Sequence, residues 1–132
     1  MIIAKLTPQQ ANELANHFLG LAQAIGDYRF DNWSALTRAE NQKLGSLQWS
    51  ILNYGEDILV LSTTLTMDEV ETSLAQIGAV TQDIKKTIHK LKSIQKAFDL
   101  AASVLTLGGA IISKNPEAIE SGIKSLVKTW KE

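Results

Sequence analysis

Histidine and acidic side chains are the residues of this chain that could hold a metal ion or move a proton. Glu13 and His17 stand four residues apart, a spacing that places both on one face of a helix. A di-iron site in a helical bundle needs Glu-x-x-His on two helices together with further inward-facing carboxylates, and the chain has no such set. The second histidine, His89, lies among lysines beside Ile88. We therefore expect no metal site and interpret both histidines as surface or flank residues.

Motifs of covalent and phosphate chemistry are missing from the sequence. There is no cysteine, which excludes disulfides, thiolate catalysis and cysteine-bound zinc or iron–sulfur clusters. The chain also lacks G-x-S-x-G, the P-loop and G-x-G-x-x-G. Gly108 and Gly109 lie inside an apolar stretch, where they indicate close helix packing or a bend rather than a phosphate cradle. We predict a protein that is not an enzyme and that uses no cofactor or small-molecule substrate.

A lysine-rich stretch at residues 85–96 supplies side chains that could bind an anion. Its predicted basic face consists of Lys85, Lys86, Lys92 and Lys96. The simplest interpretation is a solvated helix surface. The functional alternatives are the headgroups of an anionic membrane and nucleic-acid phosphates. Nucleic acid is the weaker partner because the stretch is short and contains no arginine.

The two parts of the chain differ in charge. Residues 1–84 contain four Lys/Arg and ten Asp/Glu, a net charge of −6, whereas residues 85–132 contain nine Lys and four Asp/Glu, a net charge of +5. This asymmetry favours head-to-tail contact between copies, or an anionic partner for the basic part. The alternative is two ordinary solvated surfaces.

The most unusual segment is Leu100–Ser113, LAASVLTLGGAIIS, which contains no ionisable group. It is shorter than the roughly 18 apolar residues that span a membrane. Its own chain, a second copy or lipid must cover it. The predicted contact residues of this region are Leu100, Val104, Leu105, Leu107, Ile111, Ile112 and Trp130.

Three aromatic residues interrupt the helical pattern between Asp27 and Leu36. They are Tyr28, Phe30 and Trp33, and we expect them in a linker between two helices. They either cap one end of the helical bundle or form a recognition patch.

Helix-start signals divide the chain into four predicted helices. Capping boxes begin at Thr7, Thr37 and Thr66, and Asn115-Pro116-Glu117 marks the start of the last helix. The second helix repeats apolar residues at steps of three and four from Leu44 to Leu65, as in a coiled coil. Strand-like alternation is missing. The sequence thus predicts an all-α, single-domain protein over residues 1–132, an up-and-down four-helix bundle.

The predicted helices have unequal lengths. The apolar rhythm of the third helix runs without a stop from about residue 67 to 112, and a short helix at about 116–131 folds back on it. At ~1.5 Å per residue the third helix is up to ~65 Å long, against ~42 Å for the second. We therefore expect residues 95–132 to protrude as an apolar hairpin, through which a non-catalytic interaction or assembly module contacts itself or another helical protein.

Membrane docking is the alternative function, through the lysines of residues 85–96 and the apolar residues 100–113. The layout of residues 66–132 resembles that of helical pore-forming toxins, in which long amphipathic helices carry a hydrophobic head. This resemblance covers layout alone and implies membrane activity. The N-terminus, MIIAKLTPQQ, lacks the basic and apolar regions of a secretory signal. We expect a cytoplasmic protein, with export by a signal-less route as the alternative.

Overall fold

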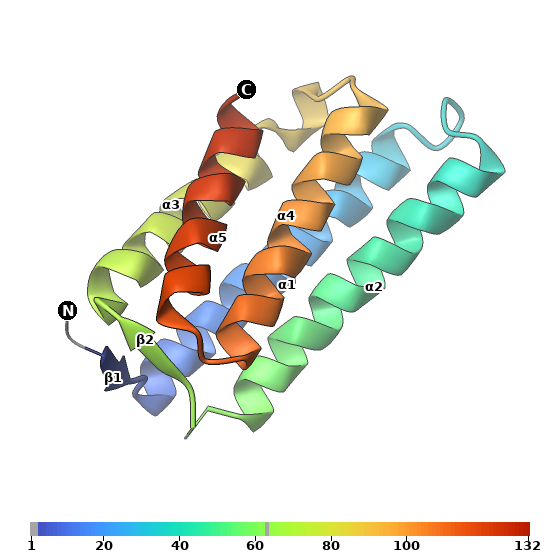
Figure 1. Ribbon diagram of the computed structural model, residues 1–132. Helices are drawn as coiled ribbons and strands as arrows, with labels where there is room; N and C mark the ends of the chain where they lie inside the picture. The colour runs from blue at the N-terminus through green and yellow to red at the C-terminus, as the bar shows by residue number, and fades with distance from the viewer. Residues whose placement is uncertain (1–2, 63) are drawn as a thin grey trace.

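The computed structural model describes residues 3–62 and 64–132. The elements formed by these residues are, in chain order, β1 (Ile3–Lys5), α1 (Pro8–Asp31), α2 (Arg38–Val60), β2 (Thr66–Asp68), α3 (Val70–Thr87), the 3-10 helix η1 (Ile88–Lys90), α4 (Ile94–Ile112) and α5 (Pro116–Lys131). Figure 1 shows the five α-helices packed side by side, with the two strands at one end. The prediction of an all-α protein is confirmed.

Three of the four predicted helix starts are confirmed by their caps. The Thr7 hydroxyl accepts a hydrogen bond from the Gln10 amide, and the Gln10 side chain accepts one from the Thr7 amide. Thr37 and Glu40 form the same reciprocal pair at the start of α2. Asn115 caps α5 by accepting from the Ala118 amide at 3.1 Å. These side chains satisfy backbone donors that a helix start leaves without a partner.

The third predicted helix start, at Thr66, is wrong. Thr66–Asp68 is instead strand β2, which pairs antiparallel with β1 so that Ala4 stands opposite Met67. Met67 is 1% exposed, which anchors this short ribbon to the core. Glu69 then adopts a left-handed conformation (φ 45°), and α3 begins at Val70. A capping box cannot reveal a strand partner that lies more than sixty residues earlier in the chain.

The predicted continuous helix from 67 to 112 is also wrong, since two helices occupy this range. After α3 the chain forms η1, and Leu91 then takes an extended conformation (φ −72°, ψ 126°). Ser93 starts α4 by accepting a hydrogen bond from the Lys96 amide at 3.2 Å. The helical rhythm of the sequence continues across this break, so periodicity alone conceals it.

The break returns α4 to the body of the molecule. α4 packs against α2 and α5 and also contacts α1, while α1 contacts α2 and α3. The expected protruding hairpin at residues 95–132 is therefore absent from the part of the chain that the structure describes (Figure 1). The helix count is five rather than four over these residues.

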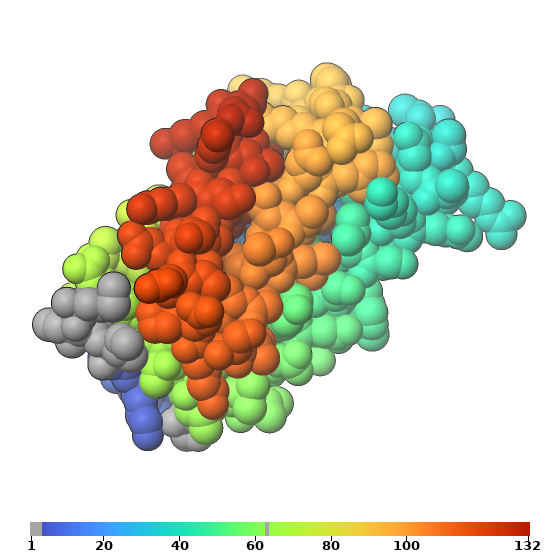
Figure 2. Space-filling model, viewed as in Figure 1, coloured from blue at the N-terminus to red at the C-terminus, as the bar shows by residue number. Residues whose placement is uncertain are grey.

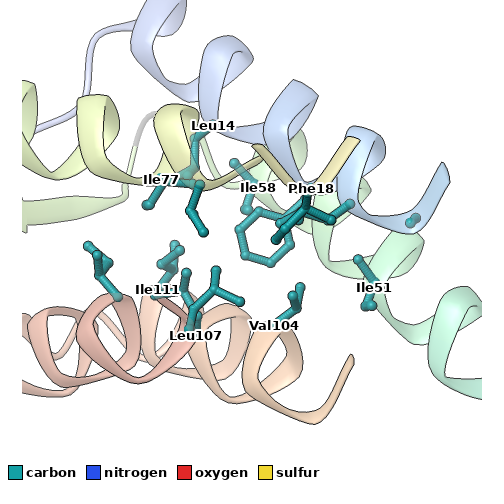
Figure 3. Packing of buried hydrophobic residues seen from close by; sticks show 14 of the residues in the cluster. Leu14, Phe18, Ile51, Ile58, Ile77, Val104, Leu107 and Ile111 are labelled. Atoms are coloured by element: carbon teal, nitrogen blue, oxygen red, sulfur yellow. The ribbon is translucent and has the colours of Figure 1, made fainter. Parts of the chain in front are cut away.

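A single hydrophobic core joins these helices. In Figure 3 Leu14 and Phe18 of α1 face side chains from α2, α3 and α4, among them Ile51, Ile77 and Leu107. The predicted repeat of α2 supplies a buried residue every seven positions, each 0% exposed: Leu44, Ile51, Ile58 and, just after the helix, Leu65. Burial of such a side chain contributes about 1.5–3 kcal/mol, so this stripe holds α2 in place.

Candidate functional site

The apolar residues predicted as a contact surface lie mainly inside the protein. The four with exposed fractions of at most 1% are Leu100, Val104, Leu107 and Ile111. Leu105 and Ile112 are partly buried against the same core, and Trp130 is 9% exposed. Because α4 returns to the body, the uncharged segment is covered by its own chain. The side chains that it turns outward are small or weakly polar: Ala102, Thr106 and Ser113.

The helix break also changes which residues of α4 face inward. If residues 67–112 formed one helix, its apolar repeat would turn Phe98 and Leu105 toward the core. Both side chains are instead only partly buried. The buried stripe instead contains Ala97, Leu100, Ala101, Val104, Leu107 and Ile111. Ser93, a residue type favoured at helix starts, is the sequence signal that could have revealed the new register.

The predicted basic face is divided between two helices and their connection. Lys85 and Lys86 lie in the last turn of α3, Lys92 lies in the connection, and all three are exposed. Lys96 belongs to α4, where its Nζ lies 5.3 Å from the centroid of the Trp130 ring. The lysines are thus distributed over α3, the connection and α4 rather than forming one helical stripe.

The aromatic linker divides into one core residue and two surface residues. α1 continues to Asp31, so Tyr28 is helical and only 1% exposed, consistent with a structural role. Burial raises the pKa of the Tyr28 hydroxyl, and the nearby Glu40 carboxylate adds to this effect. Phe30 and Trp33, by contrast, are 82% and 62% exposed. Phe30 lies in the last turn of α1 and Trp33 in the α1–α2 connection, a segment that projects from one end of the molecule (Figure 2).

The large hydrophobic side chains that remain exposed gather on one part of the chain. Within residues 3–62 and 64–132 they are Phe30, Trp33, Trp49, Leu59 and Val60, and all five belong to the end of α1, to α2 or to their connection. The sequence predicts Phe30 and Trp33 as aromatic residues of the linker. Trp49, Leu59 and Val60 are not predicted, because the heptad pattern identifies the inner face of α2 and does not reveal which outer face stays uncovered.

Polar contacts fix the position of α2 against α1. The Arg29 side chain donates from Nε to Asn41 Oδ1 (2.8 Å) and from Nη1 to Gln48 Oε1 (2.9 Å). The Gln48 amide lies in the space beside Gly26, where a Cβ would stand 2.6 Å from Gln48 Nε2. The exposed hydrophobic residues of α2 are therefore carried on a firmly positioned helix.

A groove of ≈ 680 Å³ lies between α3 and α5, and its α5 wall is basic. Its apolar lining includes Ala79 and Val80 of α3 and Ile123 and Val127 of α5, and its lysines are Lys124, Lys128 and Lys131. At one end Trp130 Nε1 donates to Asp83 Oδ2 (2.6 Å), joining the two helices. Asp83 is the acidic residue of this lining, and its carboxylate is engaged by that bond.

The two histidines occupy different places. His17 is partly buried on α1, where its imidazole lies against Gly78 of α3. Burial lowers the pKa of His17; the Glu13 carboxylate opposes this shift and Lys85 adds to it. His89 pairs with Asp31 through Nδ1. Among the described residues, three metal-ligating side chains nowhere converge.

Comparisons with protein-family models, with curated proteins and with solved structures found no match. None of the described helices is both long and apolar enough to cross a bilayer.

Proposed function

We propose that this protein is a non-catalytic helical interaction module that assembles with further copies of itself. The observation that carries the proposal is the concentration of exposed large hydrophobic residues on residues 30–60. Phe30 and Trp33 lie near the start of α2, Trp49 lies along it and Leu59 and Val60 end it; apolar side chains exposed in a group along one element mark a contact site. Tryptophan, which is 64% exposed at position 49, is among the residue types that contribute most to binding energy at protein interfaces.

The outer face of α2 offers a continuous contact stripe. Trp49, Asn53, Glu56 and Val60 follow one another at steps of four, three and four residues, so they share one face of the helix. α2 packs against α1 and α4 on its inner side, which leaves this stripe facing outward. In the proposed assembly this stripe is the contact surface, in place of residues 95–132, whose largest apolar side chains pack in the core.

A second copy is the proposed partner because of how charge is divided along the chain. The α2 stripe, which itself contains Glu56, lies in the acidic part, residues 1–84 (net −6), whereas residues 85–132 have a net charge of +5. Oppositely charged surfaces on two copies of one chain attract each other, which favours their association. Membrane docking would use other residues: Phe30, which is 82% exposed, precedes Asp31, and Asp31 pairs with His89 among the exposed lysines of the α3–α4 connection. The charge division within the chain favours a second copy over a membrane as the partner of the α2 stripe.

Sedimentation velocity of paired variants tests this proposal. Trp49→Gln removes the exposed indole and should weaken association by about tenfold, as expected for loss of a residue that contributes ~1.4 kcal/mol. Ala102→Gln changes an exposed residue of α4 and should associate like the natural chain. The opposite ranking would show that the contact lies on the 95–132 hairpin instead, and would contradict the assigned surface.

A further inference from the structure

We propose that the assembly is head-to-tail: the C-terminal end of α2 (residues 56–60) in one copy docks into the α3–α5 groove of the next. This inference rests on the proposed self-association and names the surface that receives the α2 stripe. Two independent features carry it, the chemistry of the groove and the chemistry of residues 56–60.

The groove combines an apolar floor with a basic rim. Val80, Ile123 and Val127 supply the floor, and Lys124, Lys128 and Lys131 line one wall. The ammonium groups are accessible, since the side chains of Lys124 and Lys128 are 76% and 78% exposed. A groove of this kind suits an amphipathic helix that presents apolar residues beside acidic ones.

The end of α2 has that pattern. Glu56 and Asp57 are exposed acids, and they adjoin Leu59 and Val60, which are 44% and 80% exposed. Apolar contact with the floor would remove the hydrophobic side chains from water, while the acids would meet the lysine wall. Both the charge and the hydropathy of the two surfaces are complementary.

The dimensions also agree. From residue 76 to 83 on α3 and from residue 123 to 131 on α5, the lining spans about 10–12 Å at ~1.5 Å per residue. The α2 stretch from residue 53 to 60 covers a similar ~10 Å. A third helix packed over two others at such a spacing is ordinary helix packing.

The two surfaces lie on opposite sides of one molecule. In Figure 1 α2 forms one edge of the bundle, and α3 and α5 lie toward the other. One copy therefore cannot bring its own α2 into its own groove. Contact between different surfaces on successive copies is heterologous, and it produces a ring or an open chain of copies.

Ion pairs already present on α5 offer little competition. Lys124 lies 3.1 Å from Glu120, and Lys128 lies 3.8 Å from Glu132, both as exposed pairs within one helix. Exposed pairs of this type contribute little to stability. The lysines can thus exchange these partners for Glu56 and Asp57 of a neighbouring copy.

Charge-reversal variants of the full chain test the inference by sedimentation velocity. Lys128→Glu and Glu56→Lys should each weaken association by at least about tenfold, because each places like charges in contact. An equimolar mixture of the two variants should associate again, since each groove then meets an α2 end of opposite charge. The exposed controls Lys92→Glu and Asp99→Lys make the same charge changes away from both surfaces and should leave association unchanged. Circular dichroism melting verifies that every variant is folded.

The outcomes separate the two proposals. If the natural chain is monomeric at every concentration, both the self-association and the head-to-tail contact are wrong. If the natural chain associates, and Trp49→Gln weakens it while the charge variants do not, self-association stands and the head-to-tail contact is wrong. Weakening in each variant without recovery in the mixture would also overturn it.

Discussion

The backbone of Gly108 on α4 lies directly against the ring of Tyr54 on α2. A Cβ at residue 108 would stand 2.7 Å from Tyr54 Cδ2 and 3.1 Å from Phe18 Cε2. The first distance is too short for any side chain, so α2 and α4 approach each other this closely only because residue 108 is glycine. Glycine here serves helix packing, one of the two roles that the sequence suggested.

Gly108→Ala should destabilise the protein by about 1–3 kcal/mol, the usual cost of overpacking a core. Gly109→Ala is the matched control, because a Cβ there would be 3.5 Å from the Tyr54 hydroxyl oxygen, an ordinary contact. It should be neutral or stabilising, since alanine favours the helix by about 0.5–1 kcal/mol over glycine. Urea denaturation gives both free energies of unfolding. Equal effects of the two substitutions would contradict the close packing of α2 and α4.

Lys114→Gly should stabilise the protein by about 1 kcal/mol. Lys114 follows the end of α4 with φ 59°, a left-handed conformation that costs other residues about 1–2 kcal/mol and glycine little. The amides of Lys114 and Asn115 donate to Ile111 and Ala110 carbonyls, which is the Schellman arrangement. Thermal denaturation should show a higher Tm for this variant. The control Ser113→Gly, at φ −74°, should show no such increase.

His17 should make stability decrease at mildly acidic pH. Burial lowers the pKa of His17 in the folded protein below its ordinary value of 6.5. Between that lower pKa and 6.5 the unfolded chain binds more protons, so the free energy of unfolding falls as pH decreases through this window. Urea denaturation at several pH values measures the slope. His17→Gln should flatten it, and an unchanged slope would show that other groups cause the dependence.

The bond between Trp130 and Asp83 should contribute to the attachment of α5 to α3. Trp130→Phe keeps an aromatic ring but removes the N–H donor, and we expect a loss of about 1 kcal/mol. Asp83→Asn retains an acceptor oxygen and should cost less. Denaturation curves of both variants decide the comparison. A larger loss for Asp83→Asn would mean that the carboxylate acts through contacts other than this bond.

The parts of the fold that local chemistry determines could be predicted from the sequence. Thr7, Thr37 and Asn115 cap helices because their side chains bond to amides only three residues away. The inner stripe of α2 follows from its repeat of seven residues. Both features depend on neighbours within one or two helical turns.

The remaining features depend on distant contacts. β2 forms because residues 3–5 pair with residues 66–68. The sequence at Thr66 also matches a capping box, which by itself predicts a helix start there. The turn at residues 88–93 preserves the spacing of the apolar residues, so the sequence does not reveal it. Because of this turn, Leu100–Ser113 packs into the core instead of protruding. As a result, the candidate contact surface is on α2 instead of on residues 95–132. Once α4 fills the core beside α2, the large apolar side chains left exposed among the described residues are at the end of α1, in the α1–α2 connection and on α2.

Sedimentation equilibrium of the natural chain over a wide concentration range is the most direct test of the central claim. We expect the average mass to rise with concentration above the 14.5 kDa of a single chain. We also expect high salt to oppose this rise, because screening weakens attraction between the acidic α2 end and the lysine-rimmed groove. A constant mass of one chain at every concentration and at low salt would contradict self-association through these surfaces.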